Sequence, residues 1–232
     1  NSGEREISRF RGQEALSESG IAVLHRWLES FSSHSIEERI KDNNVSRNMT
    51  NMDVGPRSEI EFWRIRMQKL ICLSEEMRSF ECTTVYNVIN NSDAKSADSS
   101  MNSAGGAFLL TSRWKTNEMH VTESLNEAKD NVKYLTTLER FIEPLYDGTP
   151  ETIKDTIPAL MNSIKMIHTI ARYYNTNDRM TELFKKITNQ MIENCKKAIL
   201  MGRESQDKLW EIPPEKLIPV LKTCTELNHA YQ

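Results

Sequence analysis

The spacing of apolar residues constrains this 232-residue chain more than any other feature. In the segment NEAKDNVKYLTTLERFIEPLY (126–146), apolar residues recur at intervals of three and four, which places them on one face of an α-helix. The stripe, which starts one residue earlier, consists of Leu125, Ala128, Val132, Leu135, Leu138, Ile142 and Leu145. The same period recurs along the chain, whereas alternating strand patterns and Asn-Gly hairpin signals do not stand out. We therefore predict an all-α protein.

Prolines and polar runs divide this helical pattern into about seven helices. After Pro56, Ser58 and Glu61 form a capping-box pattern that predicts one helix start. Thr149 and Pro150 predict another, as the N-cap and the first helical residue. The predicted helices cover about residues 21–40, 58–77, 82–89, 112–145, 150–174, 180–200 and 217–231. Short turns should make consecutive helices antiparallel neighbours.

Two polar segments organise the chain further. Residues 41–56 have the composition of a linker, so residues 1–53 are expected to form an N-terminal helix and linker. Residues 54–232 are expected to form the main helical-bundle region. Within it, the Ser-, Asn- and Gly-rich residues 91–106 cannot bury enough apolar surface to order themselves, which predicts a flexible loop. The chain starts with Asn1 rather than Met, which suggests a piece of a longer polypeptide.

Composition excludes several classes of function. The net charge of −3 and the isoelectric point near 6.0 predict neither nucleic acid nor an anionic membrane as a partner. No apolar run approaches the roughly 18 residues of a membrane span. The mean hydropathy of −0.58 suits an elongated helical protein with a large wet surface. The four scattered cysteines, without a CxxC pair, favour a reduced, intracellular protein.

The sequence contains no phosphate-binding loop and no nucleophile elbow. A metal site has one candidate. His120, Glu123, Glu127 and Asp130 are spaced three, four and three apart, so they share one helix face. Di-iron bundles need Glu-x-x-His motifs from two further helices, and the chain does not supply them. A solvated stripe is the favoured interpretation, and we predict no catalytic, cofactor-binding or metal residue.

The remaining histidines and the tryptophans favour structural roles. His25 and His34 each have a glutamate about one turn away, an ordinary surface arrangement. His168 lies among apolar residues, which favours a core histidine bonded to a carbonyl. The tryptophans are expected to pack within the bundle rather than to anchor a partner; they are Trp27, Trp63, Trp114 and Trp210.

Four segments carry a resemblance to a known family: GPRSEIEFWRIRMQKL (55–70), NEAKDNVKYLTTLERFIEPLY (126–146), IPALMNSIKMIHTIARYYNTNDRMTELFKKITNQMI (157–192) and LWEIPPEKLIPVLKTCTELNHAYQ (209–232). In sequence they resemble the N-terminal tail region of dynein heavy chains. The likeness runs from about residue 54 to the end, and EAKDNVKYL and RYYNT-x-x-RMT-x-LF resemble axonemal more than cytoplasmic chains. Residues 1–53 carry a weaker likeness centred on VLHRWLESF, and residues 91–106 depart from the family in composition.

This resemblance implies an elongated stack of antiparallel helical bundles with a non-catalytic, structural function. Such tails hold heavy chains together, seat intermediate and light chains, and attach the motor to axonemal docking proteins. The implied location is the cytoskeleton of the cytoplasm and the axoneme of a cilium or flagellum. No cofactor and no catalytic residue is carried over, although the parent chain would be an ATP-driven microtubule motor. The alternatives are a helical-bundle metal protein or enzyme using the His120–Asp130 stripe, and a free-standing helical adaptor.

Overall fold

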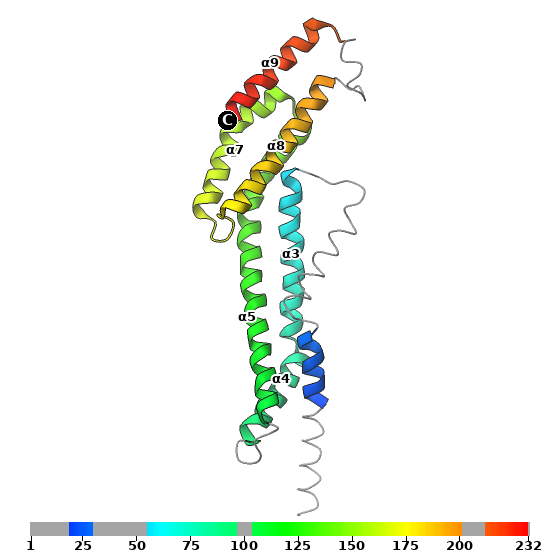
Figure 1. Ribbon diagram of the computed structural model, residues 1–232, viewed down its shortest axis with the longest axis vertical. Coiled ribbons are helices and arrows are strands. Elements are labelled where there is room, and N and C mark those ends of the chain that lie inside the picture. Colours follow the sequence, from blue (N-terminus) through cyan, green and yellow to red (C-terminus); the bar gives the residue numbers. More distant parts are fainter. Residues whose placement is uncertain (1–18, 30–54, 97–103, 201–211, 232) are drawn as a thin grey trace, which may run out of the picture. The chain divides into compact units, whose positions relative to one another are not determined.

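The computed structural model describes residues 19–29, 55–96, 104–200 and 212–231 (Figure 1). These residues are helical apart from short turns and include no strand, so the predicted all-α class is confirmed. Residues 19–29 form a helical segment. The labelled elements that follow are α3 (Pro56–Met77), α4 (Phe80–Ser96), α5 (Ala104–Leu135), the 3₁₀-helix η1 (Thr136–Phe141), α6 (Ile142–Asp147), α7 (Pro150–Ile170), α8 (Asn177–Leu200) and α9 (Pro214–Tyr231).

Contacts divide the chain into two compact units. Unit 1 comprises residues 1–50 and 68–126, and unit 2 comprises residues 51–67 and 127–232. The division falls inside α3 and inside α5, so each of these helices contributes residues to both units. Within the described residues, no helix combines the length and the hydrophobicity that crossing a bilayer requires.

The core of unit 1 is built from the helical segment 19–29 and from parts of α3, α4 and α5. The rings of Trp27 and Trp114 pack with their centroids 6.1 Å apart, as the sequence predicted for these tryptophans. Burial of side chains of this size is the main stabilising contribution, at roughly 1.5–3 kcal/mol each. The buried members of the cluster are Leu24, Leu28, Met77, Cys82, Ile89, Leu110, Trp114 and Val121.

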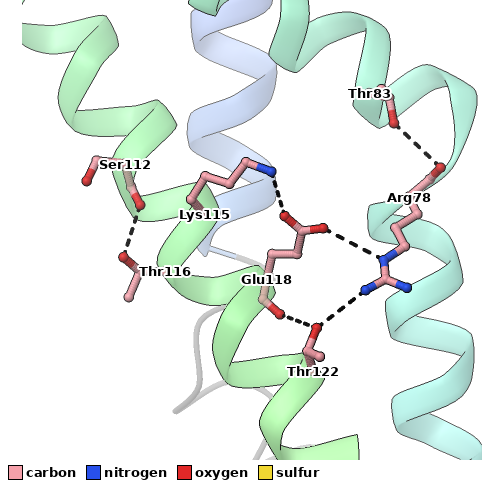
Figure 2. A network of polar contacts seen from close by, with 7 residues as sticks. All are labelled: Arg78, Thr83, Ser112, Lys115, Thr116, Glu118 and Thr122. Atoms are coloured by element: carbon pink, nitrogen blue, oxygen red, sulfur yellow. Dashed lines mark hydrogen bonds and ion pairs between the residues drawn. The ribbon is translucent and has the colours of Figure 1, made fainter.

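A surface network joins the end of α3 to α5 within unit 1 (Figure 2). Glu118 on α5 accepts a hydrogen bond from Lys115 at 2.8 Å, and its carboxylate lies 3.7 Å from the Arg78 guanidinium. Arg78 also reaches the Thr122 hydroxyl at 3.5 Å. Arg78 and Lys115 have more than half of their side chains exposed, so solvent screening limits the stabilisation from these ion pairs.

The core of unit 2 lies among η1, α6, α7 and α8. The stripe along α7 is buried as predicted, and so is the stripe along α8. The side-chain amide of Asn194 on α8 donates to the carbonyl of Gly148 at 2.8 Å, which satisfies a carbonyl at the end of α6. The buried apolar residues of α7 and α8 are Ile153, Ile157, Leu160, Ile164, Ile167, Met180, Leu183, Ile187 and Met191.

The start of α3 differs from the sequence prediction by two residues. The helix begins at Pro56, whose fixed φ suits the first helical position, and not after a cap at Ser58. The Ser58 hydroxyl donates to the carbonyl of Gly55 at 2.8 Å from inside the first turn. A Cβ at Gly55 would lie 2.8 Å from Cζ of Tyr146, so close packing favours glycine at this position. By contrast, the predicted cap of α7 is confirmed, because Thr149 accepts from the Thr152 amide at 3.3 Å.

The helix predicted over residues 112–145 is longer at its start and interrupted near its end. α5 begins at Ala104 and ends at Leu135, and the 3₁₀-helix η1 separates it from α6. At the break, Thr136 and Thr137 donate their hydroxyls to the carbonyls of Lys133 and Tyr134. Such bonds compete with the helical ladder, and Pro144 cannot donate to the ladder at all. Pro144 therefore lies in the first turn of α6 rather than at the end of one long helix.

The predicted flexible loop at 91–106 is wrong at both of its ends. α4 continues to Ser96 and α5 starts at Ala104, whereas residues 97–103 lie outside the described residues. A helix that is already formed gains one backbone hydrogen bond for each residue it adds, so it extends into a polar segment that would not nucleate one. Residues 30–40 of the predicted first helix and residues 41–54 of the predicted linker also lie outside the described residues, as do His34 and Trp210.

Candidate functional site

The polar stripe of α5 divides into two halves with different roles. His120 and Glu123 are exposed, as the sequence predicted for a solvated flank. Glu127 is different, because its carboxylate accepts a hydrogen bond from the Arg179 guanidinium at 2.5 Å. The Glu127 side chain is only 21% exposed. Asp130 accepts from the backbone amides of Arg172 and Tyr173 at 2.9 and 3.4 Å. Glu127 and Asp130 therefore hold the connection between α7 and α8 (residues 171–176) and the start of α8.

The prediction of a solvated stripe is therefore wrong for Glu127 and Asp130. The same contacts argue against the alternative in which the stripe binds a metal ion. The carboxylates of Glu127 and Asp130 accept hydrogen bonds from a guanidinium and from backbone amides. Hydrogen bonds to an ionised group are stronger than those between neutral groups. Within the part of the chain that the structure describes, no group of three or more His, Cys, Asp or Glu side chains is placed to hold a metal ion.

A second polar group in unit 2 surrounds Glu59 on α3. One carboxylate oxygen of Glu59 accepts from the Trp63 indole at 3.0 Å and from the Tyr174 hydroxyl at 2.9 Å. The other oxygen accepts from the Lys186 ammonium at 2.5 Å. The side chains of Glu59 and Lys186 are 14% and 28% exposed, so the ion pair is largely shielded from water. We call Glu59, Trp63, Tyr174, Arg179 and Lys186 the Glu59 cluster.

The aromatic members complete the Glu59 cluster. The Trp63 and Tyr174 rings meet edge to face with centroids 6.4 Å apart, and the Arg179 guanidinium lies 5.1 Å from the Trp63 ring. Burial, reinforced by the Glu59 carboxylate, raises the pKa of Tyr174 far above its ordinary value. Tyr174 therefore stays a protonated hydrogen-bond donor at neutral pH. The cluster fastens α3, α8 and the connection at 171–176 to one another.

Sequence reasoning missed the Glu59 cluster and mislocated Tyr174. It placed Tyr174 on the helix that precedes it, but α7 ends at Ile170 and Tyr174 lies in the following connection, fully buried. The only local signal was the i,i+4 pair of Glu59 and Trp63, because Tyr174 and Lys186 are 115 and 127 positions from Glu59.

The remaining predicted histidines are on the surface. His25 lies 3.4 Å from Glu29 one turn on, with more than half of each side chain exposed, as predicted. The prediction of a core histidine is wrong for His168, which is exposed in the last turn of α7. Ile164 and Ile167, which precede it on α7, are buried in the core instead.

An open cavity of about 570 Å³ lies in unit 2 between η1 and α7. The Arg140 guanidinium crosses it to donate to the buried hydroxyl of Ser163 at 2.7 Å. The hydroxyls of Thr136 and Thr137 already donate to backbone carbonyls. The Arg140–Ser163 bond thus joins η1 to α7, and the two threonine bonds lie at the break between α5 and η1.

Comparison with known proteins identifies the family. The chain matches the family described as dynein heavy chain, N-terminal region 1, over residues 23–232. It is 37% identical over 178 residues to the gamma chain of the flagellar outer arm dynein of Chlamydomonas reinhardtii, which covers 77% of this chain and 4% of that protein. It is 36% identical over 197 residues to rat (Rattus norvegicus) dynein axonemal heavy chain 5, which covers 85% of this chain and 5% of that protein.

Human (Homo sapiens) dynein axonemal heavy chain 8 is 34% identical over 180 residues, 78% of this chain and 4% of that protein. The chain thus spans only about one-twentieth of the length of these relatives. The family match starts at residue 23 and so includes the segment VLHRWLESF, where the sequence showed the weaker likeness. The relatives are axonemal and flagellar heavy chains, in agreement with the two motifs that resemble axonemal chains in the sequence. The chain belongs to the family of dynein heavy chain N-terminal regions, of the axonemal type.

Proposed function

We propose that this chain is a non-catalytic structural segment of an axonemal dynein heavy chain tail. It scaffolds assembly with other dynein subunits and contributes to docking of the motor on the axoneme. The observation that carries the proposal is the family match over residues 23–232. Its expected partners are intermediate chains, light chains, other heavy chains and axonemal docking proteins.

The polar interior of unit 2 supports a structural role. Glu59, Glu127 and Asp130 each bind groups from distant parts of the chain, so the acidic side chains best placed for chemistry are engaged in holding helices. A segment that transmits load needs helices whose relative positions do not slip. Buried, paired charges resist slipping, because breaking one pair leaves an uncompensated buried charge.

The first experiment measures ATP hydrolysis and subunit binding by the purified 232-residue chain. We expect no phosphate release above that of a heat-denatured sample, and retention of intermediate or light chains from disassembled dynein arms on the immobilised chain. Turnover of ATP that is abolished by denaturation would contradict the non-catalytic role. Binding no better than that of an unrelated helical bundle would contradict the scaffolding role.

The alternative function, a metal protein using His120, Glu123, Glu127 and Asp130, is tested by elemental analysis. Our proposal predicts less than stoichiometric iron, manganese or zinc after purification without chelators. Stoichiometric metal that is lost in a His120→Ala variant would favour the alternative, because an exposed histidine without a structural contact would not otherwise affect metal content.

A further inference from the structure

Two cysteines that are far apart in the sequence meet between α8 and α9. Cys195 lies on α8 and Cys224 on α9, and both are partly exposed free thiols. The Cys224 thiol lies close enough to Cys195 to contribute to the raised pKa of the Cys195 thiol. The other two cysteines belong to unit 1, where Cys72 is exposed and Cys82 is buried in the core.

The register of the two helices independently places these cysteines opposite each other. The Thr188 hydroxyl on α8 donates to the Tyr231 hydroxyl at 3.2 Å, and Tyr231 donates to the Phe184 carbonyl at 3.4 Å. Cys195 follows Thr188 by seven residues, and Cys224 precedes Tyr231 by seven. Seven residues are about two helical turns, or roughly 10.5 Å, on each helix. Two antiparallel helices in contact at Thr188 and Tyr231 therefore bring the cysteines together two turns away.

We propose that Cys195 and Cys224 form an oxidisable dithiol, which a peroxide converts into a disulfide between α8 and α9. This modification site is independent of the proposed scaffolding function. It would tie down an element with few buried side chains, because Leu227 is the buried residue of α9, whereas Ile218 and Leu221 are 61% and 42% exposed.

The chemistry needs one peroxide and two thiols. One cysteine sulfur attacks the O–O bond, forming a sulfenic acid, and the departing hydroxide takes up the thiol proton as water. The second sulfur then attacks the sulfenic sulfur, the S–S bond forms, the S–O bond breaks, and the second proton leaves as water. The two sulfurs lose two electrons and the peroxide gains them.

The two thiols are neighbours in a partly buried site. Burial, together with the adjacent Cys224 thiol, raises the pKa of the Cys195 thiol to about 12. The product is the same disulfide whichever sulfur makes the first attack.

The test exposes the complete 232-residue chain to hydrogen peroxide, blocks the remaining thiols with N-ethylmaleimide and maps the peptides by mass spectrometry. We expect a cross-linked peptide pair joining Cys195 to Cys224, two hydrogen atoms lighter than the separate peptides and split by a reductant. Cys72 and Cys82 should appear only in single peptides. The melting temperature of the oxidised chain should be higher by roughly 5–10 °C, because the cross-link restricts the unfolded state.

Matched variants separate this proposal from general oxidation. Cys195→Ser and Cys224→Ser should each lose both the cross-linked peptide and the rise in melting temperature, while Cys72→Ser should keep both. Peptide mapping of the unmodified chain needs no variant, so it decides the matter even if one variant folds poorly. Recovery of Cys195 and Cys224 only as sulfinic acids or in disulfides between chains would overturn the proposal.

Discussion

At the scale of residues, the polar side chains of this protein act mainly as fasteners between helices. Glu59 binds three donors from three places in the chain, and Asp130 binds two consecutive backbone amides. Each such bond contributes only about 0.5–1.5 kcal/mol when it is made, but leaving a buried partner without it costs up to about 3 kcal/mol. The bonds therefore matter more for keeping one arrangement than for the total stability.

Tyr174 makes the free energy of unfolding depend on pH. Burial and the Glu59 carboxylate raise its pKa above the ordinary value of 10.0, so the folded chain keeps a proton that the unfolded chain loses. Its contribution to stability is complete below pH 10 and declines as the pH rises further, by about 1.4 kcal/mol per pH unit. Urea unfolding from about pH 9 to about pH 11.5 should show a steeper loss of stability in the wild type than in Tyr174→Phe. Equal slopes would contradict the assignment.

At the scale of elements, the connection at 171–176 is held by neighbouring helices, among them α5. Glu127 pairs with Arg179 at the start of α8, and Asp130 caps the backbone just after α7. Further along, α5 gives way to η1 and α6, where threonine hydroxyls take up the last carbonyls of the helix.

The two halves of the α5 stripe should respond differently to substitution. Glu127→Ala and Asp130→Ala should each lower the free energy of unfolding by about 1–3 kcal/mol, because partly buried donors lose their acceptor. The matched control Glu123→Ala, on the exposed half, should change it by no more than about 0.5 kcal/mol. Urea denaturation followed by circular dichroism measures all three. Similar effects at the three positions would show that the stripe is not divided as described.

At the scale of the whole molecule, stability rests on two cores, one in each compact unit. The core of unit 1 gathers residues from the segment 19–29, α3, α4 and α5, and that of unit 2 is richest along α7 and α8. α9 adds only Leu227 as a buried side chain and is otherwise attached by partly buried contacts, such as that of Tyr231 with Phe184, and by the ion pair of Lys154 with Glu226.

Two leucine substitutions in unit 2, one in the core and one at the surface, should lower the free energy of unfolding by different amounts. Leu183 is 0% exposed and Leu221 is 42% exposed, and both change to alanine with the same loss of atoms. Leu183→Ala should lower the free energy of unfolding by about 2–5 kcal/mol, because it removes buried surface and leaves a cavity. Leu221→Ala should lower it by about 0.5 kcal/mol or less. Urea unfolding compares the two, and comparable losses would mean that α9 is packed far more tightly than the burial indicates.

The sequence by itself determined the helical class, the family and most of the apolar stripes. The three- and four-residue period depends only on which residues share a helix face, so it can be recognised without knowing what the helix packs against. The Thr149 cap is equally local. It could not determine where α5 breaks, how far α4 extends or why His168 is exposed, because neighbouring bonds and packing choose among locally similar options. Only the tertiary structure decided that Glu127 and Asp130 bind the 171–176 connection, that Glu59 collects Tyr174 and Lys186, and that Cys195 meets Cys224. Each of these contacts joins residues between 29 and 127 positions apart, and the energy that selects them comes from burial, which no local pattern records.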